Sequence, residues 1–350
     1  MTCATIWHST LVLFLLIATL CAATNDHKEV GDLAIARKHE QWMAEHGRIY
    51  EDEAERARRL EIFKDNLKFI EDFNNARMYN YTLGLNEFAD LTTEEFTAIY
   101  SGGLMKPEID FMESLRSIKY ETTTEQLNVS DISSSVDWRT KGAVNPVINQ
   151  GKCGACWSFV TCAVVEAINK IKNGELYRLS VQQLLDCDKR NLGCRGGWMT
   201  EAYKYIINNK GLTSESNYPY IGQQRRYCLN EKAKGIVATI TGYSTVPKNE
   251  KALAKAVAQQ PVAAAIYSKA REFHLYKSGV YEGPCQTSID HAVTIVGYGE
   301  TDDKTKYWLV KNTWGTSWGE KGYFRMKKDV ASSRGTCNIA TYASYPTLET

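Results

Sequence analysis

Three segments that lie far apart in the chain each carry a residue type that nucleophilic catalysis uses. Cys156 stands in the run Cys-Gly-Ala-Cys-Trp, His291 in Asp-His-Ala, and Asn312 in Asn-Thr-Trp-Gly. A thiol reacts as the thiolate, which needs a base beside it and a third group that orients the base. If the three residues act together, the fold has to bring the segment around residue 156 against two segments of the second half of the chain.

The segment that begins at Cys156 has the pattern of a helix. Apolar residues recur at helical spacing up to residue 171: Phe159, Ala163, Ala167 and Ile171. Cys156 would then lie in the first turn, where the positive end of the helix dipole favours a thiolate. His291 precedes an apolar run over residues 292–297 that is typical of a buried strand, so the imidazole would be held on a rigid element.

Asn312 and Trp314 would complete this arrangement. If the Asn312 amide oxygen accepts from one ring nitrogen, it fixes the rotation and tautomer of the histidine, and Trp314 could shield that bond from water. Each residue alone has an ordinary structural explanation, because buried cysteines and Asn-containing turns are common. Cys153 and Cys156 also form a Cys-x-x-Cys pair that would suit a thioredoxin-like redox site. The further cysteines downstream argue against that alternative.

With their flanking residues, these segments resemble those of papain-like cysteine protease precursors from plants. The resemblance covers essentially the whole chain after residue 23. It implies a catalytic site in which Gln150 supplies the oxyanion donor and Trp314 the shield, around the set Cys156, His291 and Asn312. Three positions depart from the family pattern without touching these groups: Thr313 in place of Ser, and Asn338 and Ala167 each in place of Gly.

The resemblance implies an α+β fold. The expected architecture is the papain-like two-domain fold, with a helical domain and a β-barrel-like domain, after an N-terminal helical inhibitory propeptide. The expected ranges are a signal peptide over 1–23, a propeptide over 24–131 and a mature peptidase over 132–350. Within the peptidase we expect the helical half at about 141–243, with a helix near 179–185, the β-rich half at about 244–342, and a returning strand at 343–350.

Composition is compatible with this organisation. The chain has 350 residues, of which 43% are hydrophobic and 24% charged, so it is long enough for one large or two ordinary globular domains. Its long apolar run, Leu11 to Ala23, has about 13 residues, which is too short to span a bilayer and typical of a secretory signal peptide. No Lys or Arg precedes that run, although positive residues are usual there.

A secretory route is oxidising, so disulfides are expected. Of the ten cysteines, Cys3 and Cys21 would leave with the signal peptide. Sequence alone allows many connectivities among the rest. The resemblance implies three pairs: Cys153 with Cys194, Cys187 with Cys228, and Cys285 with Cys337. Cys156 and Cys162 would stay free, and Cys162 lies six positions along the same helix, where it turns away from the Cys156 face.

Two motifs in the N-terminal third resemble papain-type propeptide signatures. The first is six residues spaced three or four apart, which lie on one face of a helix: Glu55, Arg59, Phe63, Asn66, Ile70 and Asn74. The second runs from Gly84 to Asp90 and includes Asn86 and Phe88. The resemblance therefore implies a zymogen whose propeptide occupies the cleft of the enzyme. The polar linker over 121–131 should be accessible to cleavage, so that the mature chain begins near Ile132.

The near-zero net charge of +1 is the balance of two parts of opposite sign. Residues 1–135 hold 13 Lys and Arg against 23 Asp and Glu, whereas residues 136–350 hold 29 against 18. Such blocks indicate two parts that bind each other, although two independently solvated surfaces would also explain them. Carboxylates paired with a basic partner have depressed pKa values, so their contribution is lost as the pH falls through those values. We therefore expect acid to loosen the propeptide.

The resemblance also places residues along the substrate. These are Gly196, Gly197, Trp198, Met199, Ala265, Ile289, Asp290 and Tyr342. The two glycines would let an extended peptide pair with the wall of the cleft. The apolar members would form the pocket for the side chain two residues before the scissile bond. Tyr342 should shorten this pocket, so we expect Val, Leu or Pro there over Phe or Arg.

These observations predict a secreted zymogen of a cysteine endopeptidase that works through a thiolate-imidazolium pair and an acyl-enzyme. The alternative is a catalytically impaired homologue that serves in defence, storage or binding. We expect no cofactor and no metal, because the sequence holds no metal-ligand cluster. Asn80 and Asn128 stand in N-glycosylation acceptor sequences.

The expected partners are protein and peptide substrates, the chain's own propeptide and cystatin-type inhibitors. We expect a monomer with no nucleic-acid or membrane partner, because the basic residues are scattered and no binding motif accompanies them. The expected location is the secretory pathway, leading to a vacuole or lysosome-like compartment or to the extracellular space, latex included.

Overall fold

The computed structural model describes residues 31–101, 103–105 and 132–349. The predicted signal peptide, the linker over 121–131 and Asn128 lie outside the described residues. The chain divides into two compact units, Met1–Phe69 and Ile70–Thr350, and the division falls within helix α2 (Glu53–Ala76).

The first unit is helical in its described part. Residues 31–46 form a helix, and α2 carries all six positions of the first predicted propeptide motif. Phe63 of that motif is fully buried, with its ring 4.9 Å from the ring of His39 and 5.4 Å from that of Trp42. Arg59 Nε donates to Glu55 Oε1 at 2.7 Å, one helical turn away. The spacing of three and four therefore describes a real helix, whose motif face holds both a buried ring and an ion pair.

The second unit holds the remaining elements. Its helices, with two short 3-10 turns, are α3 (Thr93–Tyr100), α5 (Cys156–Asn173), α6 (Val181–Cys187), η3 (Gly193–Arg195), α7 (Met199–Asn208), α8 (Asn230–Ala233), α9 (Glu250–Gln259), α10 (Arg271–His274) and η4 (Thr336–Asn338). Its strands are β1 (Tyr81–Leu83), β2 (Val136–Asp137), β3 (Leu212–Thr213), β4 (Ile236–Ala238), β5 (Gly242–Thr245), β6 (Val262–Ile266), β7 (Tyr276–Tyr281), β8 (His291–Glu300), β9 (Lys306–Lys311), β10 (Tyr323–Lys327) and β11 (Ala343–Thr347).

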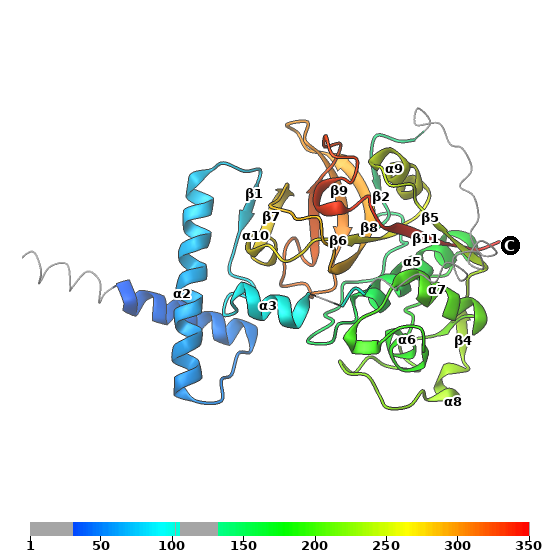
Figure 1. The fold of residues 1–350 in the computed structure, drawn as a ribbon, viewed down its shortest axis with the longest axis horizontal. Coiled ribbons are helices and arrows are strands. Elements are labelled where there is room, and N and C mark those ends of the chain that lie inside the picture. The colour runs from blue at the N-terminus through cyan, green and yellow to red at the C-terminus, as the bar shows by residue number, and fades with distance from the viewer. Residues whose placement is uncertain (1–30, 102, 106–131, 350) are drawn as a thin grey trace, which may run out of the picture. The chain divides into compact units, whose positions relative to one another are not determined.

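Nine of these strands form one sheet in the order β1-β7-β10-β9-β8-β6-β11-β5, with β2 paired to β8. The β10–β7 pair is parallel and the other pairs are antiparallel. In Figure 1 the helices α5, α6 and α7 gather on one side of this unit, and most of the large sheet lies on the other. Mixed helix and sheet of this kind is the α+β fold that the sequence predicts.

Helix α5 joins the two sides because it is buried almost all round. It contacts β8, β6 and β11 as well as α6 and α7. It ends at Gly174, whose φ of 82° requires the left-handed conformation that glycine adopts without strain. Helix α6 starts two residues later than expected, because the Ser180 side chain accepts from the backbone of Gln183 and caps the first turn.

The end of the propeptide region belongs to this second unit. Strand β1 pairs with β7, with Tyr81 opposite Gly279. The Asn74 side chain makes two hydrogen bonds of 3.0 Å with the backbone of Leu83, which ties the end of α2 to β1. Helix α3 begins with a capping box formed by Thr92 and Glu95. These local contacts fix the propeptide backbone where it runs along the sheet.

Three disulfides join the cysteines in the pairs that the resemblance implies: Cys153–Cys194, Cys187–Cys228 and Cys285–Cys337. Cys156 and Cys162 are free and buried. Asn338, which stands in place of a family Gly, has a φ of 67°. Asparagine tolerates this conformation better than most residues, and its amide donates to the Gln286 carbonyl at 2.7 Å.

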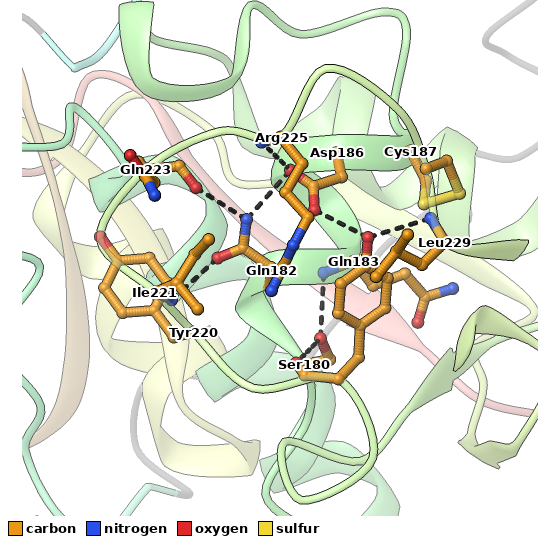
Figure 2. A network of polar contacts seen from close by, with 12 residues as sticks. Ser180, Gln182, Gln183, Asp186, Cys187, Tyr220, Ile221, Gln223, Arg225 and Leu229 are labelled. Atoms are coloured by element: carbon orange, nitrogen blue, oxygen red, sulfur yellow. Dashed lines mark hydrogen bonds and ion pairs between the residues drawn. A yellow bond between two sulfur atoms is a disulfide. The ribbon is translucent and has the colours of Figure 1, made fainter. Parts of the chain in front are cut away.

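Asp186 holds the segment after Tyr218 against α6 (Figure 2). One carboxylate oxygen accepts from Gln182 Nε2 at 2.9 Å and from the Arg225 backbone at 2.7 Å. The other accepts from the Tyr218 hydroxyl at 2.7 Å. Gln182 in turn accepts from the backbone of Ile221 at 3.0 Å. A single buried carboxylate thus satisfies donors from three parts of the chain.

We expect Asp186→Ala to lower the free energy of unfolding by about 3 kcal/mol, because it leaves buried donors without their acceptor. Urea unfolding of the precursor, followed by tryptophan fluorescence in a Cys156→Ala background that cannot digest itself, measures this change. Asp302→Ala, at an exposed position, should leave the unfolding midpoint unchanged. Equal midpoints for the two variants would contradict the role given to Asp186.

Candidate active site

Cys156 is the first residue of α5, and its side chain is fully buried. The backbone N–H groups of Ala292 and Trp157 both act on its sulfur. Ala292 directly follows His291, so the start of α5 meets the start of β8 at this point. The structure therefore brings the predicted nucleophile beside the segment that carries the predicted base.

His291 and Asn312 are joined by a direct hydrogen bond. His291 Nε2 donates to Asn312 Oδ1 at 2.8 Å, and that oxygen also accepts from the Thr313 backbone at 2.8 Å. With the proton on Nε2, the lone pair of the neutral ring is on Nδ1, which is buried and has no hydrogen-bond partner among the described residues. The imidazole therefore has one nitrogen engaged by the amide and one available to accept a proton.

The register of the sheet places Trp314 over this bond. Thr294 of β8 pairs with Lys311 of β9. Extending that antiparallel register three residues brings His291 opposite Trp314, and the two rings stack with centroids 4.6 Å apart and planes 26° apart. Trp314 is fully buried. The indole therefore covers one face of the imidazole.

In this propeptide-covered form both groups favour the neutral state. Burial raises the pKa of Cys156 to about 12, and the Asp290 carboxylate adds to that rise. Burial lowers the pKa of His291, against the hydrogen bond from Asn312 and the charge of Asp290. A thiol and a neutral imidazole are therefore the stable pair here, because a dry site disfavours both charges.

Gln150 is buried and held by both halves of the second unit. Its Oε1 accepts from the Thr313 hydroxyl at 2.5 Å, and its Nε2 donates to the Cys153 carbonyl at 3.0 Å. The Tyr220 hydroxyl donates to the Gln150 carbonyl at 2.6 Å, and Tyr220 belongs to the segment that Asp186 secures (Figure 2). An amide nitrogen has two hydrogens, and the Cys153 carbonyl engages one of them.

The glycine segment lies against the propeptide. Gly197 donates to the Gly103 carbonyl at 3.1 Å and accepts from the backbone of Met105 at 3.0 Å, so residues 103–105 run beside it as a strand. A Cβ on Gly103 would lie 3.0 Å from the Cys156 sulfur and 2.8 Å from the Gly154 carbonyl oxygen. Only a glycine lets the backbone pass this close to the thiol. Gly196, with φ 119°, forms the turn before Gly197.

Five predicted pocket residues gather in one apolar cluster. Trp198, Met199 and Ala265 are buried members of the apolar core around α5, and Ile289 and Tyr342 are partly buried against that core. The rings of Trp198 and Tyr342 meet edge to face with centroids 5.7 Å apart. Leu104 of the propeptide is buried in the same cluster. An aliphatic side chain of the chain itself thus lies with the residues expected to receive the substrate.

Asp290, which is expected to contact substrate, is buried in this form, and its carboxylate accepts hydrogen bonds from Ser268. Ser268 donates to it twice, from the backbone at 2.9 Å and from the hydroxyl at 2.6 Å. The Ser268 hydroxyl also meets the hydroxyl of Ser101, in the propeptide, at 3.1 Å. Sequence reasoning did not single out Ser268 or Ser101, because their contacts join residues that no motif links.

The second propeptide motif anchors α3 beside this site. Asn86 Nδ2 donates to the His274 carbonyl at 2.7 Å, and Phe88 lies edge-on to Trp314 at 5.8 Å. Asp90 is buried, and a side chain on Gly84 would collide with Lys277. The ring of His274 lies 4.7 Å from Phe96 of α3. His274 was also not singled out from the sequence, since it stands in no motif.

The described ranges hold neither a cluster suited to a metal ion nor a helix suited to a membrane. No group of three or more His, Cys, Asp and Glu side chains there is arranged to hold a metal ion. No helix in the part of the chain that the structure describes is long and apolar enough to cross a membrane. Of the two predicted glycosylation positions, Asn80 is described and exposed.

Comparison with known proteins gives the family. The model of the papain family cysteine protease matches residues 132–347, and that of the cathepsin propeptide inhibitor domain (I29) matches residues 39–96. A senescence-specific cysteine protease, SAG39, of Oryza sativa subsp. japonica is 47% identical over 94% of this chain and 95% of its own length. Fruit bromelain of Ananas comosus is 47% identical over 89% of this chain and 86% of its own length.

Solved structures agree with these relatives. A recombinant stem bromelain precursor is 45% identical and superposes with a TM-score of 0.83, covering 91% of this chain and 100% of that one. The proform of the ragweed pollen allergen Amb a 11 is 37% identical with a TM-score of 0.79, covering 90% of this chain and 95% of that one. The chain therefore belongs to the papain family of cysteine proteases, as a thiol protease precursor that carries its own propeptide inhibitor domain.

Proposed function

We propose that the precursor matures to an endopeptidase whose nucleophile is Cys156, whose base is His291 and whose orienting amide is Asn312. The hydrogen bond from His291 Nε2 to Asn312 Oδ1, under the Trp314 ring, supports this assignment most directly. It fixes the tautomer in which Nδ1 accepts the thiol proton. The reaction is the hydrolysis of peptide bonds in proteins and peptides.

The first half of the reaction forms an acyl-enzyme. The Cys156 thiolate attacks the carbonyl carbon, and the carbonyl oxygen becomes an oxyanion. The Gln150 side-chain amide and the Cys156 backbone N–H donate to that oxygen. Each donor stabilises the transition state by about 3 kcal/mol. The imidazolium of His291 then gives its proton to the leaving amine as the C–N bond breaks. The products are a thioester on Cys156 and a free amine.

The second half releases the acid. Neutral His291 takes a proton from water, which attacks the thioester carbonyl through the same oxyanion site. The C–S bond breaks, and the thiolate-imidazolium pair is restored. Thr313 supports both steps, since it donates from its backbone to Asn312 and from its hydroxyl to Gln150.

The precursor is inactive because residues 103–105 lie where substrate would pair. Gly103 covers the thiol, and Leu104 lies among the pocket residues. Cleavage near Ile132 separates the propeptide, 24–131, from the peptidase, 132–350, with helical and β-rich halves at about 141–243 and 244–342. The start of the papain family match at residue 132 supports this boundary. The mature enzyme is a monomer open to cystatin-type inhibitors.

The three disulfides support folding in an oxidising compartment. We therefore infer a secretory route, with the signal peptide at 1–23, that leads to a vacuole or lysosome-like compartment or outside the cell.

The assignment is tested by incubating the precursor and its Cys156→Ala variant in reducing buffer at about pH 4 to 5. Hydrolysis of a fluorogenic Val-Arg peptide should appear with loss of the propeptide in the natural chain and be absent in the variant. Cys162→Ala is the matched control, because it removes a second free, buried thiol of the described residues that lies six positions along the same helix from Cys156. If the natural chain loses its propeptide and still does not hydrolyse the peptide, the result would favour the impaired homologue that serves in defence, storage or binding.

The pocket predicts a preference for Val, Leu or Pro two residues before the scissile bond, because Tyr342 occupies its depth. Tyr342→Ala should raise the ratio of kcat/KM for Phe over Val at that position by roughly tenfold or more, since a few methylene groups of space become available. Tyr227→Ala, at a side chain that is 67% exposed, should leave the ratio unchanged. A natural enzyme that already prefers Phe would refute the pocket assignment.

His274 supplies a reason for activation by acid. Both of its ring nitrogens are buried without a hydrogen-bond partner among the described residues. Burial lowers the pKa of His274 to about 3, and Arg271 of the same helix adds to the lowering. In the free enzyme the ring regains water, so its pKa returns toward about 6.5. A histidine whose pKa is lower in the complex than in the free enzyme stabilises the complex at pH values above the free pKa. This stabilisation is lost as the pH falls from about 6.5 toward about 3.

We therefore expect α3 to open between pH 6.5 and 5, before most carboxylates take up protons. Amide hydrogen exchange of residues 93–100 in the Cys156→Ala precursor, corrected for intrinsic rates, measures the opening. Exchange should rise by up to roughly tenfold per pH unit, and His274→Gln should remove that rise. His46→Gln, in the first unit, should keep it. If His274→Gln opens with the same pH dependence as the parent, the paired carboxylates and not His274 drive the release.

A further inference from the structure

We propose that Ser268 is a positioning residue of the mature peptidase, whose hydroxyl holds the Asp290 carboxylate and so sets the pH range over which Cys156 and His291 are charged in that enzyme. The inference deepens the proposed function and rests on it. Ser268 does not touch the reacting atoms and acts through Asp290.

Hydrogen bonds from Ser268 fix the orientation of the Asp290 carboxylate. Asp290 directly precedes His291, and its backbone N–H donates to the Ile266 carbonyl at 3.0 Å. One carboxylate oxygen accepts from the Ser268 backbone at 2.9 Å and the other from the Ser268 hydroxyl at 2.6 Å. Ser268 is fully buried and Asp290 is 3% exposed. Ser268 thus engages both oxygens and prevents the carboxylate from rotating toward the imidazole.

The charge of Asp290 reaches both members of the reacting pair. It raises the pKa of the Cys156 thiol, after burial, and it supports the charged form of His291. The hydroxyl of Ser268 points its hydrogen at the carboxylate, so the dipole of that bond partly offsets the negative charge that His291 feels. Removing the hydroxyl should therefore strengthen the hold of Asp290 on the imidazolium.

Asp290 also acts on Tyr267, the residue after β6. Burial raises the pKa of Tyr267, and Asp290 and Glu272 add to the rise, so this phenol is neutral through the range in which the enzyme would work. The charged groups that face one another here are therefore Asp290, Cys156 and His291, with Glu272 acting on Tyr267 from α10. A change at Ser268 is felt through Asp290.

The propeptide contacts the same hydroxyl. Ser268 donates to Asp290, so the Ser101 hydroxyl is the donor in the 3.1 Å contact with Ser268. In the precursor this contact is buried. When the propeptide leaves, Ser268 loses a donor but keeps its own bond to Asp290. The positioning role therefore belongs to the mature enzyme. The contact with Ser101 shows that the Ser268 hydroxyl lies at the surface that the propeptide covers.

The test is the pH profile of kcat/KM for self-processed enzyme carrying Ser268→Ala, Ser268→Thr, Asp290→Asn or the Ala/Asn pair. The basic limb reports loss of the proton from His291. Ser268→Ala should move it upward by about 0.5 unit, less than the 1 to 3 units that a whole charge can cause. Asp290→Asn should move it downward. Ser268→Thr, which restores the hydroxyl, should return it to the natural position.

The double variant decides whether Ser268 acts through Asp290. With Asn at 290, the further change at Ser268 should leave the limb in place, because the charge that the hydroxyl offsets is gone. The rate of Cys156 alkylation by iodoacetamide against pH should follow the same shifts without turnover. Ser344→Ala, which removes another buried serine hydroxyl, should leave both profiles unchanged.

Two results would overturn the inference. One is a Ser268→Ala profile that is lowered equally at every pH with a reduced melting temperature, which is the behaviour of a structural serine. The other is an unchanged basic limb beside a shifted Asp290→Asn limb. Activity that survives Cys156→Ala would instead remove the proposed function itself, so the two failures are distinguishable.

Discussion

The hydrogen bond from His291 to Asn312 requires β8 and β9 to keep one register, and the surrounding side chains are arranged about that requirement. Thr294 of β8 pairs with Lys311 of β9. This register brings His291, at the start of β8, together with Asn312 and Trp314, which follow β9. Thr313 then extends the arrangement to Gln150 through its hydroxyl. A change of one residue in the pairing would turn each of these side chains to the opposite face of the sheet. The chemistry therefore depends on a ladder whose hydrogen bonds lie outside the site.

The precursor stores this site in an uncharged form. Gly103 passes over the thiol, and the dry surroundings favour a neutral thiol and a neutral imidazole. The same physical effect acts on His274 beside α3, where a ring with no hydrogen-bond partner among the described residues resists protonation. On the function proposed above, entry of water as the propeptide leaves would reverse the preference at both places, so that inhibition and activation would follow from one change in solvation.

The sequence predicted what depends on local pattern and on motifs. The helix at 156–173, the strand from His291 and the disulfide pairs follow from spacing or from the family resemblance. The start of α6 moved by two residues because a cap at Ser180 decides it. Ser268, Ser101 and His274 were not predicted, because their roles arise from contacts between distant segments that carry no pattern. Such contacts depend on tertiary packing, which periodicity does not encode.

Strand β1 occupies an edge of the nine-stranded sheet next to β7. Gly279 lets this pairing approach so closely that a side chain there would collide with the backbone of Asn80. Departure of the propeptide leaves the N–H and C=O groups of β7 open on that side, where another chain could add as a strand. Lys277, exposed on β7, places a positive charge beside that edge. A lysine on an edge strand disfavours pairing with a further chain, so the strand that pairs with β1 here carries a charge that would oppose self-association once β1 is gone.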